Sequence, residues 1–273
     1  MILASASPVG LLLGGAAALA YAVPALGAGA MGVMGAIGAR RVLIVAWLLH
    51  GLQLAWTLIG EAPHFGFAQT LSITVWLAVT VYAIESRLYP QMPARWALAG
   101  FGTLAVVLAL LFPGARLPAT SSPLLGLHWA LGLSAYGLFA AAVAHGWLMG
   151  RAERQMRHAA GGVGEPSVPL LTLERLMFRF IGAGFALLTL TLVAGLFFGE
   201  QLYGSAHSGW RWSHKNVFTA LSWAVFAVLL LGRWRFGWRG RRAVRMLYLG
   251  TALLLLGYAG SRFVMEVLLE RGP

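Results

Sequence analysis

The chain has 273 residues, of which 59% are hydrophobic and only 10% are charged. Soluble domains carry about 25% charged residues, so this composition excludes an ordinary soluble fold. The formal net charge is +12, and the sequence contains no cysteine, which excludes disulfides, thiol catalysis and Cys-ligated metals.

Eight apolar runs follow one another along the chain, each close to the roughly 20 residues that a membrane-spanning helix needs. They cover about residues 8–27, 42–60, 67–84, 96–112, 124–149, 178–198, 214–232 and 246–268. Because the runs are continuous rather than alternating, they favour helices over a β-barrel. We therefore predict an all-α fold, a polytopic transmembrane helical bundle that forms a single membrane domain over residues 1–273.

The longest polar segment, residues 150–177, contains several glycines and prolines. This composition is typical of a flexible connector, which we expect on the cytoplasmic side. A weak division of the chain into five spans followed by three falls at this segment.

Basic residues are shared unevenly between the two sets of loops. One side holds five of the 20, namely Arg116, Arg211, Lys215, Arg262 and Arg271, and the other side holds the remaining fifteen. An excess of Lys and Arg marks cytoplasmic loops, so we expect a multi-pass protein of the bacterial inner (plasma) membrane with both termini on the outer, periplasmic side. The same crowding explains the net charge without nucleic acid, and the basic run 233–245 is expected to contact anionic membrane lipid.

Histidines are the main candidates for chemistry, because an ionisable residue within a bilayer is costly. His128 lies about 6 Å inside the outer boundary of the fifth span, and His214 opens the seventh span at the same face. If those two helices are neighbours, the two imidazoles could ligate a haem iron from opposite sides. The alternatives are a histidine hydrogen-bonded within the bundle for His128, and a helix cap or interfacial residue for His214.

Aromatic and basic residues surround these two histidines in the sequence. Four tryptophans could line a porphyrin, and two cations could pair with its propionates: Trp129, Trp210, Trp212 and Trp223, with Arg211 and Lys215. The alternative for the tryptophans is an aromatic belt at the membrane interface.

Two further histidines lie within predicted spans. His50 is midway along the second span, where it could be another haem ligand, a proton-carrying group or a hydrogen-bonded residue of the bundle. His145 is near the cytoplasmic end of the fifth span, and we expect it to extend towards the interface. Glu85 could pair with Arg87 or Arg95 at the cytoplasmic end of the third span.

Three stretches carry a family resemblance. SPLLGLHWALGLSAYGLF resembles the histidine-bearing helix of the cytochrome c assembly family of the CcsA and CcmC type, and GEAPHFGFAQTLSITVW resembles its outer loop and third helix. GWRWSHKNVFTALSWAVFAVLLLGR resembles the family's tryptophan-rich segment, with matches at Trp210, Trp212, Lys215, Trp223 and Arg233. His50 falls about where the family has a membrane-embedded histidine. With eight predicted spans, the chain is most similar to the short YpjD or HemX-like members.

The resemblance implies haem, which we expect to be b-type, and a role in cytochrome c assembly or haem handling at the outer face of the membrane. It also implies cytochrome c biogenesis proteins or an apocytochrome as partners. The family motif has Asp-Pro and Glu where this chain has Ser213, His214 and Asn216. We therefore expect no autonomous haem lyase activity and assign no catalytic residue.

Two other functions compete with this interpretation. One is a non-enzymatic membrane adaptor that regulates a partner complex, or a haem-biosynthesis enzyme, through the basic cytoplasmic loops. The other is a small transporter, for which the sequence offers only His50 and scattered Ser and Thr residues at mid-membrane.

Overall fold

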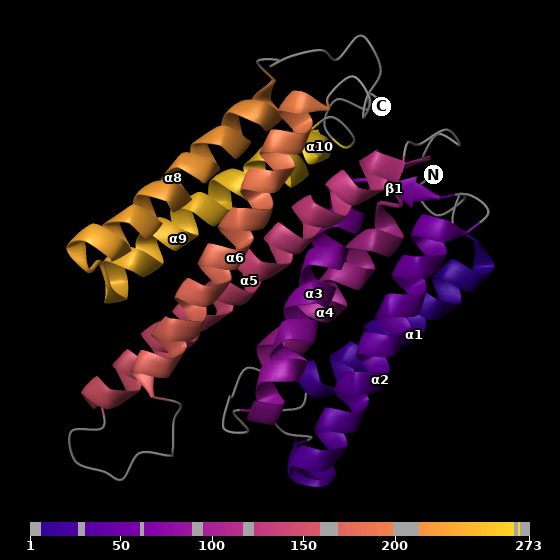
Figure 1. Ribbon diagram of the computed structural model, residues 1–273. Helices are drawn as coiled ribbons and strands as arrows, with labels where there is room; N and C mark the ends of the chain where they lie inside the picture. Colours follow the sequence, from indigo (N-terminus) through magenta and orange to yellow (C-terminus); the bar gives the residue numbers. More distant parts are fainter. Residues whose placement is uncertain are drawn as a thin grey trace. The chain divides into compact units, whose positions relative to one another are not determined.

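A computed structural model describes residues 7–26, 31–60, 63–88, 95–116, 123–158, 169–198, 213–264 and 267. Within these residues the chain is helical apart from one small two-stranded sheet (Figure 1). The chain divides into two compact units. Unit 1 comprises Met1–Pro118 with Arg262–Pro273, and unit 2 comprises Ala119–Ser261.

Unit 1 is built from four helices and the small sheet. The helices are α1 (Pro8–Leu26), α2 (Met31–Ile59), α3 (Phe67–Leu88) and α4 (Arg95–Leu111). Helices α2 and α4 both pack against α1 and against α3. Two glycines allow the close approach of α1 and α4, since a Cβ on Gly14 would overlap Leu110 and one on Gly102 would overlap the ring of Tyr21. Strand β1 (His64–Phe65) pairs antiparallel with β2 (Ala115–Arg116) where α2 and α4 end.

Unit 2 is a bundle of four long helices. They are α5 (Pro123–His158), α6 (Leu170–Phe197), α8 (His214–Phe236) and α9 (Gly240–Leu255), which continues into the π-helical turn η2 (Leu256–Gly260). Unit 2 ends at Ser261, the first residue of the short helix α10 (Ser261–Phe263). Helix α5 packs along α6 and α9, and α8 packs along the same two helices. Helices α5 and α8 therefore face each other across the centre of the bundle (Figure 1).

The centre of unit 2 contains a stacked pair of phenylalanines. The rings of Phe139 and Phe226 are 3.9 Å apart and nearly parallel, and both side chains are fully buried. Glycines on the neighbouring helices provide the space, because a Cβ on Gly184 would lie 3.1 Å from Phe139 and one on Gly250 would lie 2.8 Å from Phe226. A larger residue at Gly250 would force these helices apart.

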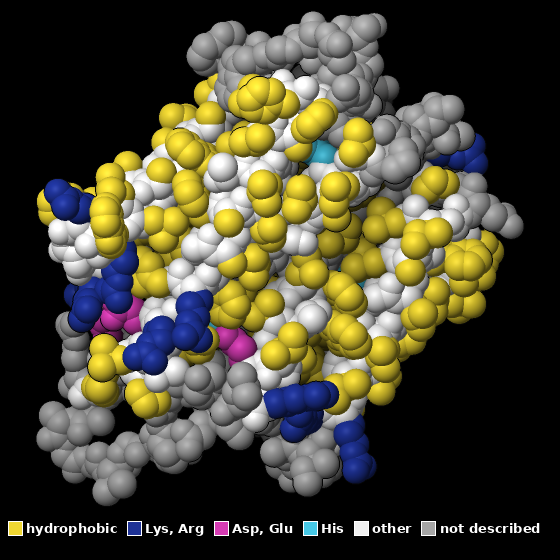
Figure 2. Space-filling view, viewed as in Figure 1, with side chains coloured by type: hydrophobic (Ala, Val, Ile, Leu, Met, Phe, Trp, Pro, Cys, Tyr) yellow, Lys and Arg dark blue, Asp and Glu magenta, His cyan; other side chains and the backbone are white. Residues whose placement is uncertain are grey.

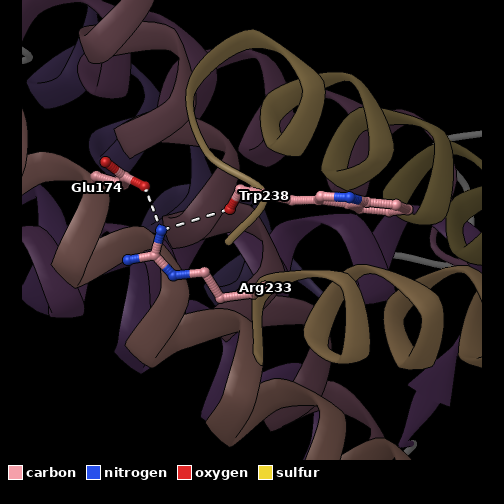
Figure 3. Close-up of polar contacts among 3 residues, drawn as sticks. All are labelled: Glu174, Arg233 and Trp238. Atoms are coloured by element: carbon pink, nitrogen blue, oxygen red, sulfur yellow. Dashed lines mark hydrogen bonds and ion pairs between the residues drawn. The ribbon is translucent and has the colours of Figure 1, made fainter. Parts of the chain in front are cut away.

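An ion pair joins the ends of α6 and α8. The Arg233 guanidinium donates a hydrogen bond to the Glu174 carboxylate at 2.8 Å and a longer one to the Trp238 carbonyl at 3.4 Å (Figure 3). Arg233 also lies 4.5 Å from the ring of Phe178. Gly237, with φ of 63°, ends α8 in the left-handed conformation that glycine adopts most readily. These contacts hold the α8–α9 turn against α6.

Many large hydrophobic side chains are exposed on both units, and they cover much of the face in Figure 2, as expected of helices that face lipid. Leu12, Ile59 and Phe197 are among the large hydrophobic side chains that are mostly exposed. Within the described part of the chain, seven helices are long and apolar enough to cross a membrane, and Leu98–Leu111 is a shorter apolar helix. The prediction of an all-α polytopic membrane bundle is confirmed.

Two boundaries differ from those expected from the sequence. Helix α5 continues to His158 and α6 begins at Leu170, so the connector expected at 150–177 is helical at both ends. The division into compact units falls after Pro118 rather than within that connector. The reason is that α5 packs extensively along α6, which places the fifth span with the last three. Loop length was thus a poor guide to which helices pack together.

Candidate functional site

His128 lies in the second turn of α5 and is partly buried. Its ring packs against α6, since a Cβ on Gly195 would lie 3.5 Å from the His128 Cε1 atom. A bulky side chain at position 195 would compete with the imidazole for this space. The imidazole is therefore placed at one end of unit 2, at the contact between α5 and α6.

The first turn of α8 contributes to the same end of the unit. Ser213 caps the helix by accepting a hydrogen bond from the Asn216 N–H at 3.3 Å. His214 follows with an exposed side chain. Lys215 is close enough to His128 to interact with it electrostatically, and its Nζ lies 5.2 Å from the centre of the Tyr258 ring. An imidazole from α5 and a cation from α8 thus lie near each other.

The substitution of the family motif at this turn has a local structural explanation. The family has Asp at the position of Ser213, and both residues are favoured helix N-caps. It has Pro at the position of His214, the first helical residue, where the backbone N–H needs no partner within the helix. By this resemblance, a helix start at Ser213 is compatible with both sequences, with an imidazole in place of the pyrrolidine ring.

The π-helical turn η2 packs against the beginning of α8 and was not anticipated from the sequence. Gly257 allows this contact, because a Cβ there would lie 3.2 Å from Phe218 and 3.3 Å from the Lys215 carbonyl oxygen. The Tyr136 hydroxyl donates a hydrogen bond to the carbonyl of Leu254 at 2.7 Å, just before the turn. Single π-helical turns are frequent at functional sites.

Only some of the tryptophans and basic residues predicted at the site lie within the described residues. Trp129 is partly buried in α5. The Trp223 indole donates a hydrogen bond to the Thr189 hydroxyl at 2.9 Å, and its ring stacks on Phe185 at 5.4 Å, so it joins α8 to α6. Trp210, Arg211 and Trp212 lie outside the described residues.

His50 occupies a different environment, in unit 1. It is fully buried, with its Nε2 2.8 Å from the Ser72 hydroxyl and its Nδ1 3.4 Å from the Tyr21 hydroxyl. The Tyr21 ring also meets the imidazole edge-on. Both ring nitrogens are therefore engaged, and ligation of a metal by His50 would require one of these contacts to be released.

Two other polar residues singled out in the sequence, His145 and Glu85, are both buried. The His145 Nδ1 atom lies 2.8 Å from the Ala141 carbonyl oxygen, so the expectation that this side chain extends towards the interface is wrong. Two ion pairs that sequence reasoning missed are Glu174–Arg233 and Glu153–Arg241, because each joins helices far apart in the chain.

Comparison with known proteins agrees with this architecture. The profile of the family described as cytochrome c assembly protein matches residues 39–269, which includes α3 to α9 and every described residue of the candidate site. The chain belongs to the cytochrome c assembly protein family.

Relatives of two kinds are found. Inner membrane protein YpjD of Escherichia coli strain K12 is 28% identical over 244 residues, covering 85% of this chain and 89% of the relative. Cytochrome c biogenesis protein CcsA of Prochlorococcus marinus is 26% identical over 258 residues, covering 82% of this chain and 81% of the relative. CcsA of Gloeobacter violaceus is 33% identical over 101 residues, or 37% of this chain and 29% of the relative. No solved structure matches.

The family and the helices together define the protein class. This chain is a multi-pass inner-membrane protein of the cytochrome c biogenesis family. The match extends through both units, so the candidate site lies within the shared part of the fold.

Proposed function

We propose that this chain binds haem at the end of unit 2 formed by the beginnings of α5 and α8, and assists cytochrome c assembly there. The observation that carries the proposal is the His128 imidazole, packed on Gly195 and within electrostatic range of Lys215. Imidazole suits iron, and a lysine suits a carboxylate, so this pair matches the two chemical ends of haem. Membership of the family provides the biological context.

In this proposal His128 and His214 would hold the haem iron through their imidazole nitrogens. Helices α5 and α8 face each other across the bundle, so side chains from both helices could contribute to one site. The haem would be held without a thioether bond, because the chain has no cysteine, and we propose that it is b-type. When bound, haem supplies a redox-active iron and two propionates. His50 is the one candidate ligand that we place outside this site.

Cationic groups orient the cofactor in this proposal. The helix dipole makes the start of α8 electropositive, and Lys215 adds a full charge, although cations are normally disfavoured in a first helical turn. A propionate would offset that cost. We assign Lys215 and Arg211 to the propionates, and Trp129, Trp210, Trp212 and Trp223 to the surroundings of the porphyrin.

The site is proposed to lie at the outer, periplasmic face of the membrane. Support comes from the opposite end of unit 2, which holds Arg154, Arg233, Arg241 and Arg245, as expected of a cytoplasmic end. An outer site could exchange haem with an apocytochrome or with other cytochrome c biogenesis proteins. Because the Asp-Pro and Glu of the family motif are replaced, we assign an assisting role rather than autonomous haem lyase activity.

The test is the absorbance of the full chain, purified in detergent from cells well supplied with haem. We expect a Soret band, and haem that acidic acetone extracts, as b-type haem does. The variants are His128→Ala, His214→Ala and the double variant, with His64→Ala in unit 1 as a matched control. Loss of both axial ligands is expected to lower haem occupancy by at least about tenfold.

Three results would contradict the proposal. One is a wild-type protein without a Soret band from haem-replete cells. Another is a double variant that keeps its haem, which would place the ligands elsewhere. The third is an equal loss in the His64→Ala control, which would show that haem retention does not depend on the α5–α8 end of unit 2.

A further inference from the structure

A groove opens between α5 and α9 at the end of unit 2 opposite His128. Its volume is about 300 Å³. The lining residues on α5 are Gly146, Trp147, Met149, Gly150, Glu153 and Arg154, and those on α9 are Arg241, Val244, Arg245 and Tyr248. The proposed haem site uses none of these residues, so the groove requires a separate explanation.

The groove carries an excess of positive charge. Arg154, Arg241 and Arg245 are exposed, and only one of the three has an acidic partner among the described residues: Arg241 lies 3.2 Å from Glu153. Arg154 is also near Tyr248, with which it interacts electrostatically. Three guanidinium groups against one carboxylate leave two positive charges at the groove.

The position of these arginines on α9 is itself unfavourable. Arg241 and Arg245 lie in the first two turns of the helix, and the first turn contains no acidic residue. The helix dipole is positive at this end, so cations there raise the energy of the helix unless an anion is near. An anionic ligand would relieve the repulsion from both the dipole and the guanidinium groups.

The other part of the groove is apolar. Trp147, Met149 and Val244 line it, together with two glycines of α5. A Cβ on Gly146 would lie 3.4 Å from Val244, and one on Gly150 would lie 3.6 Å from the Arg154 Nη1 atom. Because the glycines have no side chains, α5 leaves open space beside the charged residues. A groove lined by both guanidinium groups and apolar side chains matches a molecule with a charged head and a hydrocarbon tail.

We infer that the groove between α5 and α9 binds an anionic phospholipid, with its phosphate on Arg154, Arg241 and Arg245. Arginine binds phosphate through two parallel hydrogen bonds, which a single point charge does not offer. The upper part of an acyl chain lies along Trp147, Met149 and Val244. In Figure 2, Lys and Arg side chains with acidic ones among them gather near the ends of the helices, where headgroups would lie.

The experiment measures binding of phosphatidylglycerol to the full chain by native mass spectrometry, with phosphatidylcholine as the neutral comparison. The test variant is Arg154→Gln with Arg245→Gln. The matched control is Arg235→Gln with Arg239→Gln, which removes the same charge at the same end of unit 2 but outside the groove. We expect the groove variant to bind phosphatidylglycerol about tenfold more weakly, and the control to stay within about twofold of the wild type.

A second variant changes the shape of the groove and not its charge, so the site can be tested even if the charge variant does not fold. Gly150→Leu keeps every arginine and fills the space in the groove beside Arg154, so it too is expected to weaken phosphatidylglycerol binding, with an unchanged circular dichroism spectrum. Equal losses in the groove and control variants would overturn the inference in favour of diffuse surface attraction. Competition by soluble glycerol phosphate as strong as that by lipid would show a phosphate site with no lipid component. Unchanged binding in both groove variants would exclude the site.

Discussion

His50 in unit 1 and His128 in unit 2 are both histidines inside long apolar helices, but their surroundings differ. His50 is fully buried and contacts the hydroxyls of Tyr21 and Ser72 through its two nitrogens. His128 is partly buried, rests against a glycine and lies near Lys215. Depth in the membrane alone would rank His50 first for function. The contacts instead suit His50 to holding helices together and His128 to binding a ligand.

The largest effect on stability is expected from His50→Ala. The change would leave a cavity and deprive Tyr21 and Ser72 of a partner in the core of unit 1, at a cost of about 2–4 kcal/mol. Resistance to unfolding by sodium dodecyl sulfate, compared with wild type, measures this. The Soret band is expected to keep its position and its intensity per folded protein. Loss of that band in a folded His50→Ala protein would make His50 a haem ligand and reverse the comparison.

The next largest effect on stability is expected in unit 2, at the end opposite His128. Arg233→Leu would leave Glu174 without its guanidinium partner in a pair whose side chains are 30% and 10% exposed. Because the pair is only partly buried, we expect a loss of about 1–3 kcal/mol, measured in the same unfolding assay.

Arg241→Leu is the matched control for that variant. It breaks the Arg241–Glu153 pair, whose side chains are 59% and 24% exposed, and should cost less than about 1 kcal/mol. Neither change is expected to move the Soret maximum. An equal cost for both variants would show that the contacts of Arg233 with Trp238 and Phe178 add nothing to unit 2.

A smaller effect, on haem binding rather than on folding, is expected from Lys215→Gln. If Lys215 pairs with a propionate as proposed, removing its charge should weaken haem binding by about fivefold, and the difference from wild type should shrink at high salt. Haem titration of the purified protein measures this, with Lys215→Arg as the charge-preserving control. A salt-independent difference would argue against an electrostatic role and would leave His128 as the only supported contact.

The smallest effect is expected at the cap of α8. Ser213→Ala removes the hydroxyl that accepts the Asn216 N–H and should cost about 1 kcal/mol. Ser213→Asp introduces the family's residue and should leave stability within about 0.5 kcal/mol of wild type, because Asp is an equally good cap. Both are measured by unfolding in sodium dodecyl sulfate. If Ser213→Asp were as destabilising as Ser213→Ala, the capping hydrogen bond would not account for the stability of the helix start.

Part of the candidate site could be predicted from the sequence because it is local. His128 and the start of α8 stand in stretches that resemble the family, and Ser213 is a recognisable N-cap before an apolar run. Gly195, Tyr258 and the π-helical turn could not be predicted, because each matters only through a contact with another helix. The same holds for Glu174, which has no sequence relation to Arg233 but is its partner across two helices.

The sequence by itself determined the class of this protein. A charged fraction of 10% and long apolar runs admit only a helical membrane protein, since backbone polar groups in lipid must be satisfied within each helix. Only the tertiary structure decided which helices share a unit, because hydrophobicity is similar on every face and packing depends on where glycines let helices approach. For the same reason, only the structure separated the fully buried His50 of unit 1 from the partly buried His128 of unit 2.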